Sequence, residues 1–281
     1  MASAFWEQVV AGGLQVPKDR PLDELTAELV SMLGSPDPTL RDDTAYATLA
    51  TWIGRGVYDD LLAGLGDGMA AGLEVGLGQT GTDTIFRRSF SALILGECVD
   101  RHNIVRALPA IKALEWGDRI ATWYIRERDL RGFVDGKGWA HAVAHGADAI
   151  GALGRSPDLG VPELTVMLDV LADRLLLPAD EFLVCSEPDR MAMATMDILR
   201  RNLVPLSILE PWVARLAGSA TSRGLGSSKN PFLRTFNVQA YLRALHLQLA
   251  IGSGHPDVRS DLLLVLVDAL RATNKNYLRP R

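Results

Sequence analysis

One pattern recurs along the chain: one or two charged or polar residues precede a helix that is rich in small residues. It begins near Arg41, Arg87, Trp139, Arg190 and Phe236, at intervals of 46, 52, 51 and 46 residues. Repeats of about 40 to 47 residues are typical of HEAT and armadillo proteins, in which each repeat is a pair or triplet of helices. The spacing therefore predicts an all-α fold, a HEAT/armadillo-like α-solenoid of about five helix pairs.

The segments between and around these helices also have the periodicity of amphipathic helices. We expect helices at about residues 1–34 (two helices), 39–53, 58–77, 104–129, 161–176, 206–217 and 256–273. No run of alternating β-branched residues bounded by hairpin turns predicts a sheet. The longest predicted loop, residues 218–231, is either a connector or a mobile lid. We expect one domain that spans residues 1–281.

Composition and charge exclude several classes of function. The formal net charge is −5 and Lys and Arg are not clustered, so we expect no nucleic-acid partner. The longest apolar run, Leu262–Val267, is too short to cross a bilayer, and the N-terminus lacks the pattern of a signal peptide. The two cysteines, Cys98 and Cys185, are far apart and in apolar surroundings, which favours core positions. We expect a soluble, cytoplasmic protein with no membrane partner.

Residues 123–155 concentrate ionisable groups, glycines and aromatics more than any other stretch. Glu127, Asp129 and Arg131 precede a glycine-rich segment that contains Lys137. We expect a helix to start near Trp139, and Arg131 and Lys137 to face an anionic group beside its N-terminus, where the helix dipole also favours negative charge.

Along that helix, polar and apolar residues separate onto different faces. His141, His145 and Asp148 share one face. Trp139, Val143 and Ile150 lie on the opposite face, and we expect them to pack in the core. Small residues on both flanks allow neighbouring helices to approach closely. We therefore expect the polar stripe to lie on the concave surface that α-solenoids use for binding.

The two histidines admit three interpretations. The first is a metal site, because His141 and His145 have workable ligand spacing and Glu127 or Asp129 would supply a further ligand. The metalloprotease motif H-E-x-x-H is absent, because residue 142 is Ala. The second is acid/base chemistry by either histidine with Asp148 or Glu127. The third is packing alone, with histidines bonded to neighbouring helices and carboxylates paired with arginines.

A second concentration of charge lies one repeat later, at Asp189 and Arg190. These residues occupy the position equivalent to the His141 region, and adjacent repeats place equivalent positions side by side. A shared groove is therefore expected. Two pairs in earlier repeats would extend it: Arg41 with Asp42, and Arg87 with Arg88.

Three motifs carry a resemblance to a known family. They are Leu40-Arg-Asp followed by Ala45-Tyr, the stretch E-x-D-L-R-G-F-V-D-G-K-G-W-A-H-A-V-A-H-G-A-D at 127–148, and Glu187-Pro-Asp-Arg. On these residues the chain resembles a family of bacterial proteins grouped as a domain of unknown function, with a HEAT-like all-helical body. The resemblance covers most of the chain and implies a fold class and a site, but no activity.

The expected function is a binding protein that holds a polar small molecule or a peptide segment in the concave groove. The expected ligand-binding residues are Glu127, Asp129, Arg131, Lys137, Trp139, His141, His145, Asp148, Asp189 and Arg190. An enzyme that uses His141 or His145 is the alternative, and a scaffold in which the motif serves only packing is the third possibility. The sequence assigns no catalytic residue, cofactor or metal.

Overall fold

The computed structural model describes residues 2–221 and 230–278, so most of the predicted loop at 218–231 lies outside the described residues. Thirteen α-helices, one π-helix, two 3₁₀ turns and one sheet of two short strands make up the regular structure of the described chain, which confirms the all-α class. None of the described helices is both long and apolar enough to cross a membrane. The chain divides into two compact units, Met1–Ala149 and Ile150–Arg281.

The first unit contains six complete α-helices, two shorter helical segments and the hairpin. In chain order they are α1 (Ala2–Ala11), α2 (Leu22–Met32), the π-helix η1 (Thr39–Tyr46), α3 (Ala47–Gly54), the 3₁₀ turn η2 (Asp59–Leu61), α4 (Leu62–Gly72), α5 (Thr84–Val105), α6 (Ala110–Arg126), β1 (Phe133–Val134) and β2 (Gly138–Trp139). The start of α7 (Ala142–Arg155), as far as Ala149, also belongs to this unit.

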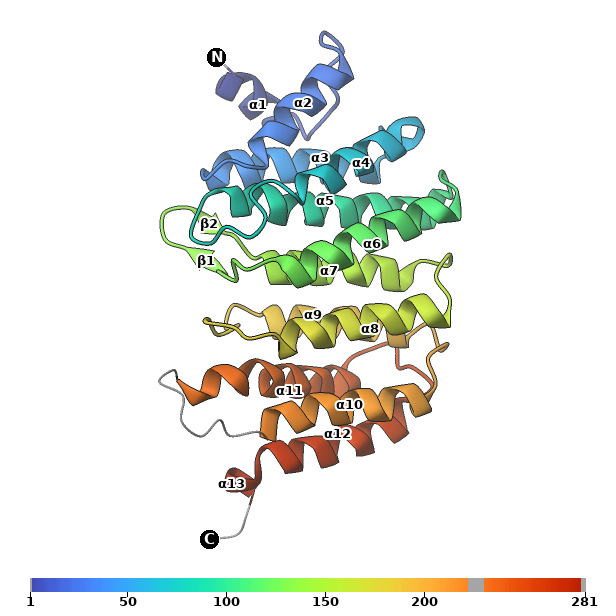
Figure 1. Cartoon of the computed structure of the whole chain (residues 1–281). Coiled ribbons are helices and arrows are strands. Elements are labelled where there is room, and N and C mark those ends of the chain that lie inside the picture. Colours follow the sequence, from blue (N-terminus) through green and yellow to red (C-terminus); the bar gives the residue numbers. More distant parts are fainter. Residues whose placement is uncertain (1, 222–229, 279–281) are drawn as a thin grey trace. The chain divides into compact units, whose positions relative to one another are not determined.

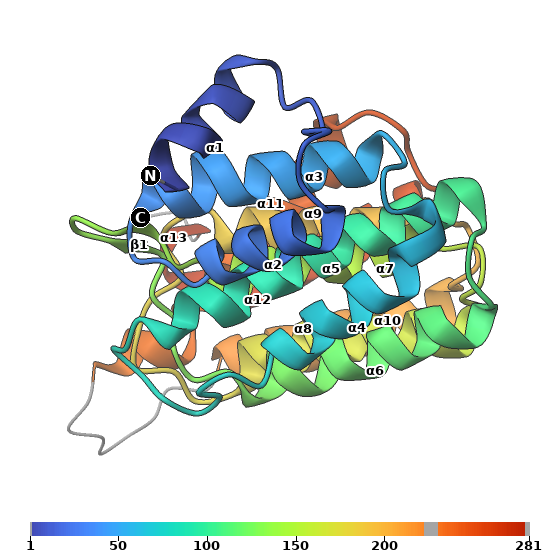
Figure 2. The same cartoon turned by 90° about the horizontal axis from the view of Figure 1, so that it is seen from above.

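Helix α5 is the centre of this unit. It contacts α3, α4 and α6 (Figure 1). Helices α4 and α6 also contact each other, and Figure 2 shows them side by side on one flank of α5. Its side chains Phe86 and Phe90 are buried, as are the indoles of Trp52, Trp116 and Trp123 around it. Burial of such large aromatic side chains contributes a major share of the hydrophobic stabilisation of a unit of this size.

Two expected helix boundaries are wrong. The helix expected over 104–129 is interrupted: α5 ends at Val105, Arg106 adopts a left-handed conformation (φ 57°), and α6 begins after Pro109. Proline fixes its own φ and lacks an N–H, so it suits a position beside a helix start and interrupts a continuous helix. The helix expected from Trp139 begins three residues later, at Ala142, because Trp139 pairs in β2.

The glycine-rich helix expected over 58–77 is shorter and is stabilised by packing. Helix α4 ends at Gly72, and a Cβ at Gly66 would lie only 2.1 Å from the Trp116 ring. The indole therefore packs directly on the α4 backbone. At Gly68, in contrast, a Cβ would meet nothing within 4 Å, so that glycine only weakens the helix.

The second unit is also helical. It contains the end of α7, then α8 (Val161–Leu176), α9 (Glu187–Leu199), α10 (Leu206–Thr221), the 3₁₀ turn η3 (Pro231–Arg234), α11 (Phe236–Ile251), α12 (Arg259–Thr273) and α13 (Lys275–Leu278). In its core the Tyr241 hydroxyl hydrogen-bonds Thr195 Oγ1 at 2.6 Å, and burial raises the pKa of Tyr241. The Trp212 indole N–H donates to the carbonyl of Leu168 at 3.0 Å.

Candidate functional site

The glycine-rich segment before α7 forms an antiparallel hairpin. Phe133 pairs with Trp139 and Val134 with Gly138, and the Lys137 N–H closes the turn onto the Val134 carbonyl at 2.9 Å. Figure 2 shows the hairpin beyond the ends of the neighbouring helices. The expectation of no sheet missed this hairpin, although an Asp-Gly pair between apolar residues is a recognised hairpin signal.

The hairpin is attached to the start of η1. The Arg41 guanidinium donates to the Lys137 carbonyl at 2.8 Å, and a Cβ at Gly138 would lie 3.1 Å from both the guanidinium and Pro38. Gly138 has φ +75°, which only glycine adopts without strain. Its close approach to Arg41 explains why a glycine stands here.

His141 lies between the hairpin and α7 in a strained conformation. Its φ is +54°, which is uncommon for a residue with a side chain. Its N–H donates to the Arg131 carbonyl at 3.0 Å, and its own carbonyl accepts from the His145 N–H at 2.9 Å. Such strain costs of order 1 to 3 kcal/mol and is concentrated at functional sites.

Four ring contacts connect the exposed hairpin to buried Phe90 of α5. The successive centroid distances are 5.0 Å for Phe133 to Trp139, 4.6 Å for Trp139 to His141, 5.6 Å for His141 to His145, and 4.9 Å for His145 to Phe90. The Trp139 and His141 rings are stacked, with 19° between their planes. Phe133 and Trp139 are 53% and 41% exposed, whereas each histidine is 6% exposed. We call these five residues the ring series.

Polar contacts surround the buried end of the ring series. Ser89 Oγ and His145 Nδ1 are 2.8 Å apart, and Ser89 is fully buried. The Arg41 guanidinium lies over the rings of Phe86 and Phe90 at 4.2 and 5.0 Å. Burial lowers the pKa of Arg41, and its Nε atom is buried without a hydrogen-bond partner in the described structure. Burial likewise raises the pKa of Asp42, which forms an ion pair with Arg41 at 2.7 Å.

Glu127 lies in a buried ion pair. Arg88 Nε donates to one of its carboxylate oxygens at 2.6 Å and Arg88 Nη2 to the other at 3.1 Å, and both side chains are at most 2% exposed. The Trp123 indole N–H and the N–H groups of residues 128 and 129 also donate to this carboxylate. These bonds fix the turn after α6.

Asp129, Arg131 and Lys137 connect this turn and the hairpin to the loop before α5. Buried Asp129 accepts from Arg131 Nε at 2.8 Å and from the Gly81 N–H at 2.9 Å. Lys137 Nζ donates to Asp83 at 2.6 Å, and both side chains are about two-fifths exposed. Lys137 and Asp83 therefore provide accessible charge beside the ring series.

The remaining predicted residues lie outside the ring series. Asp148 is half-buried on α7. Asp189 is exposed near the start of α9, in the second unit, and its carbonyl accepts from Gln248 at 2.8 Å; Arg190 follows it and is half-buried. Across residues 2–221 and 230–278, no group of three or more His, Cys, Asp or Glu side chains is arranged to hold a metal ion.

A sequence family described as "Protein of unknown function (DUF2785)" matches residues 73–247, which is more than half of the chain. The chain belongs to the DUF2785 family. No curated protein and no solved structure matches it.

The DUF2785 match includes all the predicted site residues and the whole ring series. Arg41 and Asp42, which contact the hairpin, precede the matched range. Sequence reasoning placed them only as an extension of a groove. It did not identify Phe133, Ser89 or Phe90, because their part in the site depends on contacts between segments far apart in sequence.

Proposed function

We propose that this DUF2785 protein is a cytoplasmic binding protein with a HEAT-like solenoid body, which holds a polar small molecule or a peptide segment on its concave face. The observation that supports the proposal best is the exposed Trp139 ring stacked on His141. An aromatic ring fixed from behind offers a large contact area and loses little conformational entropy on binding.

The surroundings of Trp139 favour a polar ligand with one flat face. Phe133 lies against Trp139 on the opposite strand, and the Lys137–Asp83 pair offers both a cation and an anion nearby. We propose that the flat face packs on the two exposed rings while the polar groups bond to Lys137 and Asp83. In this arrangement the ion pairs of Glu127 and Asp129 hold the hairpin and the loops rather than contact the ligand.

The test is mass spectrometry of the native protein, purified without a histidine tag, on wild type and two variants. Trp139→Ala removes the exposed ring of the site, whereas Tyr277→Ala removes an exposed ring of α13 in the second unit. We expect a co-purified molecule on wild type and Tyr277→Ala and none on Trp139→Ala. Equal occupancy of all three proteins would contradict the proposal.

Acid/base catalysis at the histidines is the second candidate. The hydrogen bond between Ser89 and His145 favours it, because a partner on one ring nitrogen fixes the orientation of the imidazole and selects its tautomer. The same experiment separates the two functions. A binding protein returns its ligand with unchanged mass after prolonged incubation, whereas an enzyme returns a product whose formation is lost in His145→Gln.

A further inference from the structure

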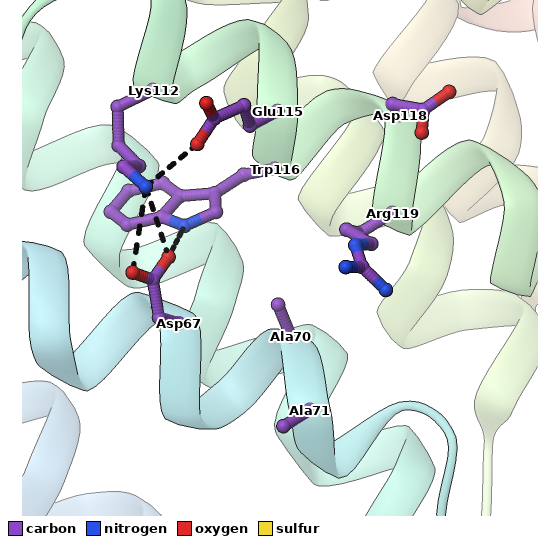
Figure 3. Close-up of a pocket in the computed structure, with 8 residues that line it drawn as sticks. All are labelled: Asp67, Ala70, Ala71, Lys112, Glu115, Trp116, Asp118 and Arg119. Atoms are coloured by element: carbon purple, nitrogen blue, oxygen red, sulfur yellow. Dashed lines mark hydrogen bonds and ion pairs between the residues drawn. The ribbon is translucent and has the colours of Figure 1, made fainter.

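A pocket of the first unit lies between α4 and α6 and shares no residue with the ring series. Its volume is about 390 Å³. Figure 3 shows the side chains that line it: Asp67, Ala70, Ala71, Lys112, Glu115, Trp116, Asp118 and Arg119. Pockets of roughly 300 Å³ or more are large enough for a small molecule.

The two helices separate here because of their side-chain sizes. Trp116 packs directly against Gly66, so α4 and α6 are in close contact at that point. One turn further along α4, Ala70 and Ala71 present only methyl groups towards α6. The small side chains of Ala70 and Ala71 therefore leave the gap between α4 and α6, and a larger residue at position 71 would fill it.

One end of the pocket has an excess of negative charge. Lys112 Nζ lies 3.4 Å from Asp67 and 2.7 Å from Glu115, so one ammonium faces two carboxylates. The Trp116 indole N–H donates to one Asp67 oxygen at 2.9 Å. A carboxylate has about four acceptor positions, so Asp67 retains capacity for another donor.

The other end carries the guanidinium of Arg119 together with the carboxylate of Asp118, which Figure 3 shows on the same side of the pocket. Arg119 lies on the far side of Ala70 from Asp67 (Figure 3). Within the described part of the chain, Arg119 forms no ion pair and no side-chain hydrogen bond. A guanidinium that is not already engaged by another side chain can bind a carboxylate through two parallel hydrogen bonds.

We propose that this pocket binds a free α-amino acid, with the carboxylate on Arg119 and the ammonium on Asp67. The charges favour a zwitterion over an ion of one sign. A dianion would meet the carboxylates of Asp67, Glu115 and Asp118, and a dication would meet Arg119 and Lys112. Complementary charge at both ends selects a ligand that carries both groups.

The experiment is calorimetric titration of the full chain with L-leucine, L-phenylalanine and L-glutamate. The best binder is then compared with its analogue that lacks the amino group and its analogue that lacks the carboxylate. We expect at least one of the three to bind, and each analogue to bind at least about tenfold more weakly, because each loses one charge-assisted contact. No binding below about 10 mM, or an analogue that binds equally well, would overturn the proposal.

Two variants locate the binding. Arg119→Gln removes the cation and Ala71→Leu fills the gap; both positions are exposed, so the fold tolerates the changes. Each is expected to weaken binding by at least about tenfold. The matched control is Arg126→Gln, which alters an exposed arginine of α6 outside the pocket and leaves binding unchanged. Trp139→Ala is also expected to leave the affinity for the amino acid unchanged, which separates this pocket from the ring series. Full affinity in Ala71→Leu would refute the assignment of binding to this pocket.

Discussion

Replacement of Glu127 by Gln tests whether this residue is a structural counter-ion or a component of a reactive site. A glutamine has one oxygen where glutamate has two. If that oxygen keeps the bonds from the N–H groups of residues 128 and 129, the new amide N–H₂ faces Arg88 Nε and the Trp123 N–H, both of which are donors. The substitution therefore removes the counter-charge and leaves two buried donors without an acceptor.

The magnitude follows from the burial of the pair. Arg88 is fully buried and Glu127 is 2% exposed, so solvent cannot replace the lost carboxylate. Breaking a buried ion pair costs about 3 to 5 kcal/mol. This is a large fraction of the roughly 5 to 15 kcal/mol by which a typical domain is stable.

Urea unfolding followed by tryptophan fluorescence measures this loss. Five of the six tryptophans lie in the first unit, so the signal reports mainly on the unit that contains the pair. The control is Glu74→Gln, which breaks an exposed pair with Arg126 at 3.7 Å and is expected to cost less than about 1 kcal/mol. A loss for Glu127→Gln as small as that of the control would refute the reasoning and make Glu127 a candidate reactive residue again.

Three further experiments test packing, charge and burial. Gly66→Ala is expected to destabilise the protein by about 1 to 3 kcal/mol, because its Cβ would overlap an indole, whereas Gly68→Ala in open space is expected to stabilise it by about 0.5 to 1 kcal/mol. Hydrogen bonds from the Arg101 guanidinium of α5 lower the pKa of Asp59. Asp59→Asn is therefore expected to reduce the melting temperature at pH 6. The difference from wild type is expected to vanish as the pH falls through the lowered pKa. Burial raises the pKa of the Cys98 thiol, so a thiol reagent at pH 8 is expected to label half-buried Cys185 in the native protein and Cys98 only after unfolding.

Each of these experiments has an outcome that contradicts its premise. Equal stability of the two alanine variants would show that the indole does not pack on the α4 backbone. A melting-temperature difference for Asp59→Asn that persists in acid would exclude the ionised carboxylate as its cause. Rapid labelling of both thiols in the native protein would contradict the burial of Cys98.

The class of the fold and the location of its densest polar segment follow from local sequence patterns. Helical periodicity is local, because residues three and four apart share a face wherever a helix forms, so it predicts helices without knowledge of their neighbours. Prolines and glycines that end helices act locally too. The Asp135-Gly136 pair is also a local signal, and the structure forms the β1–β2 hairpin around it.

The roles of the charged residues, in contrast, depend on tertiary contacts. Glu127 looked like a candidate base, and its partner Arg88 lies 39 residues earlier in the chain. Lys137 contacts Asp83 and Arg41, which lie 54 and 96 residues earlier in the chain. A carboxylate or an ammonium has the same appearance in a sequence whether it is paired or open to a ligand, because pairing depends on contacts that local patterns do not encode. The same holds for the pocket of α4 and α6, which exists because two alanines on one helix face a tryptophan and an arginine on another.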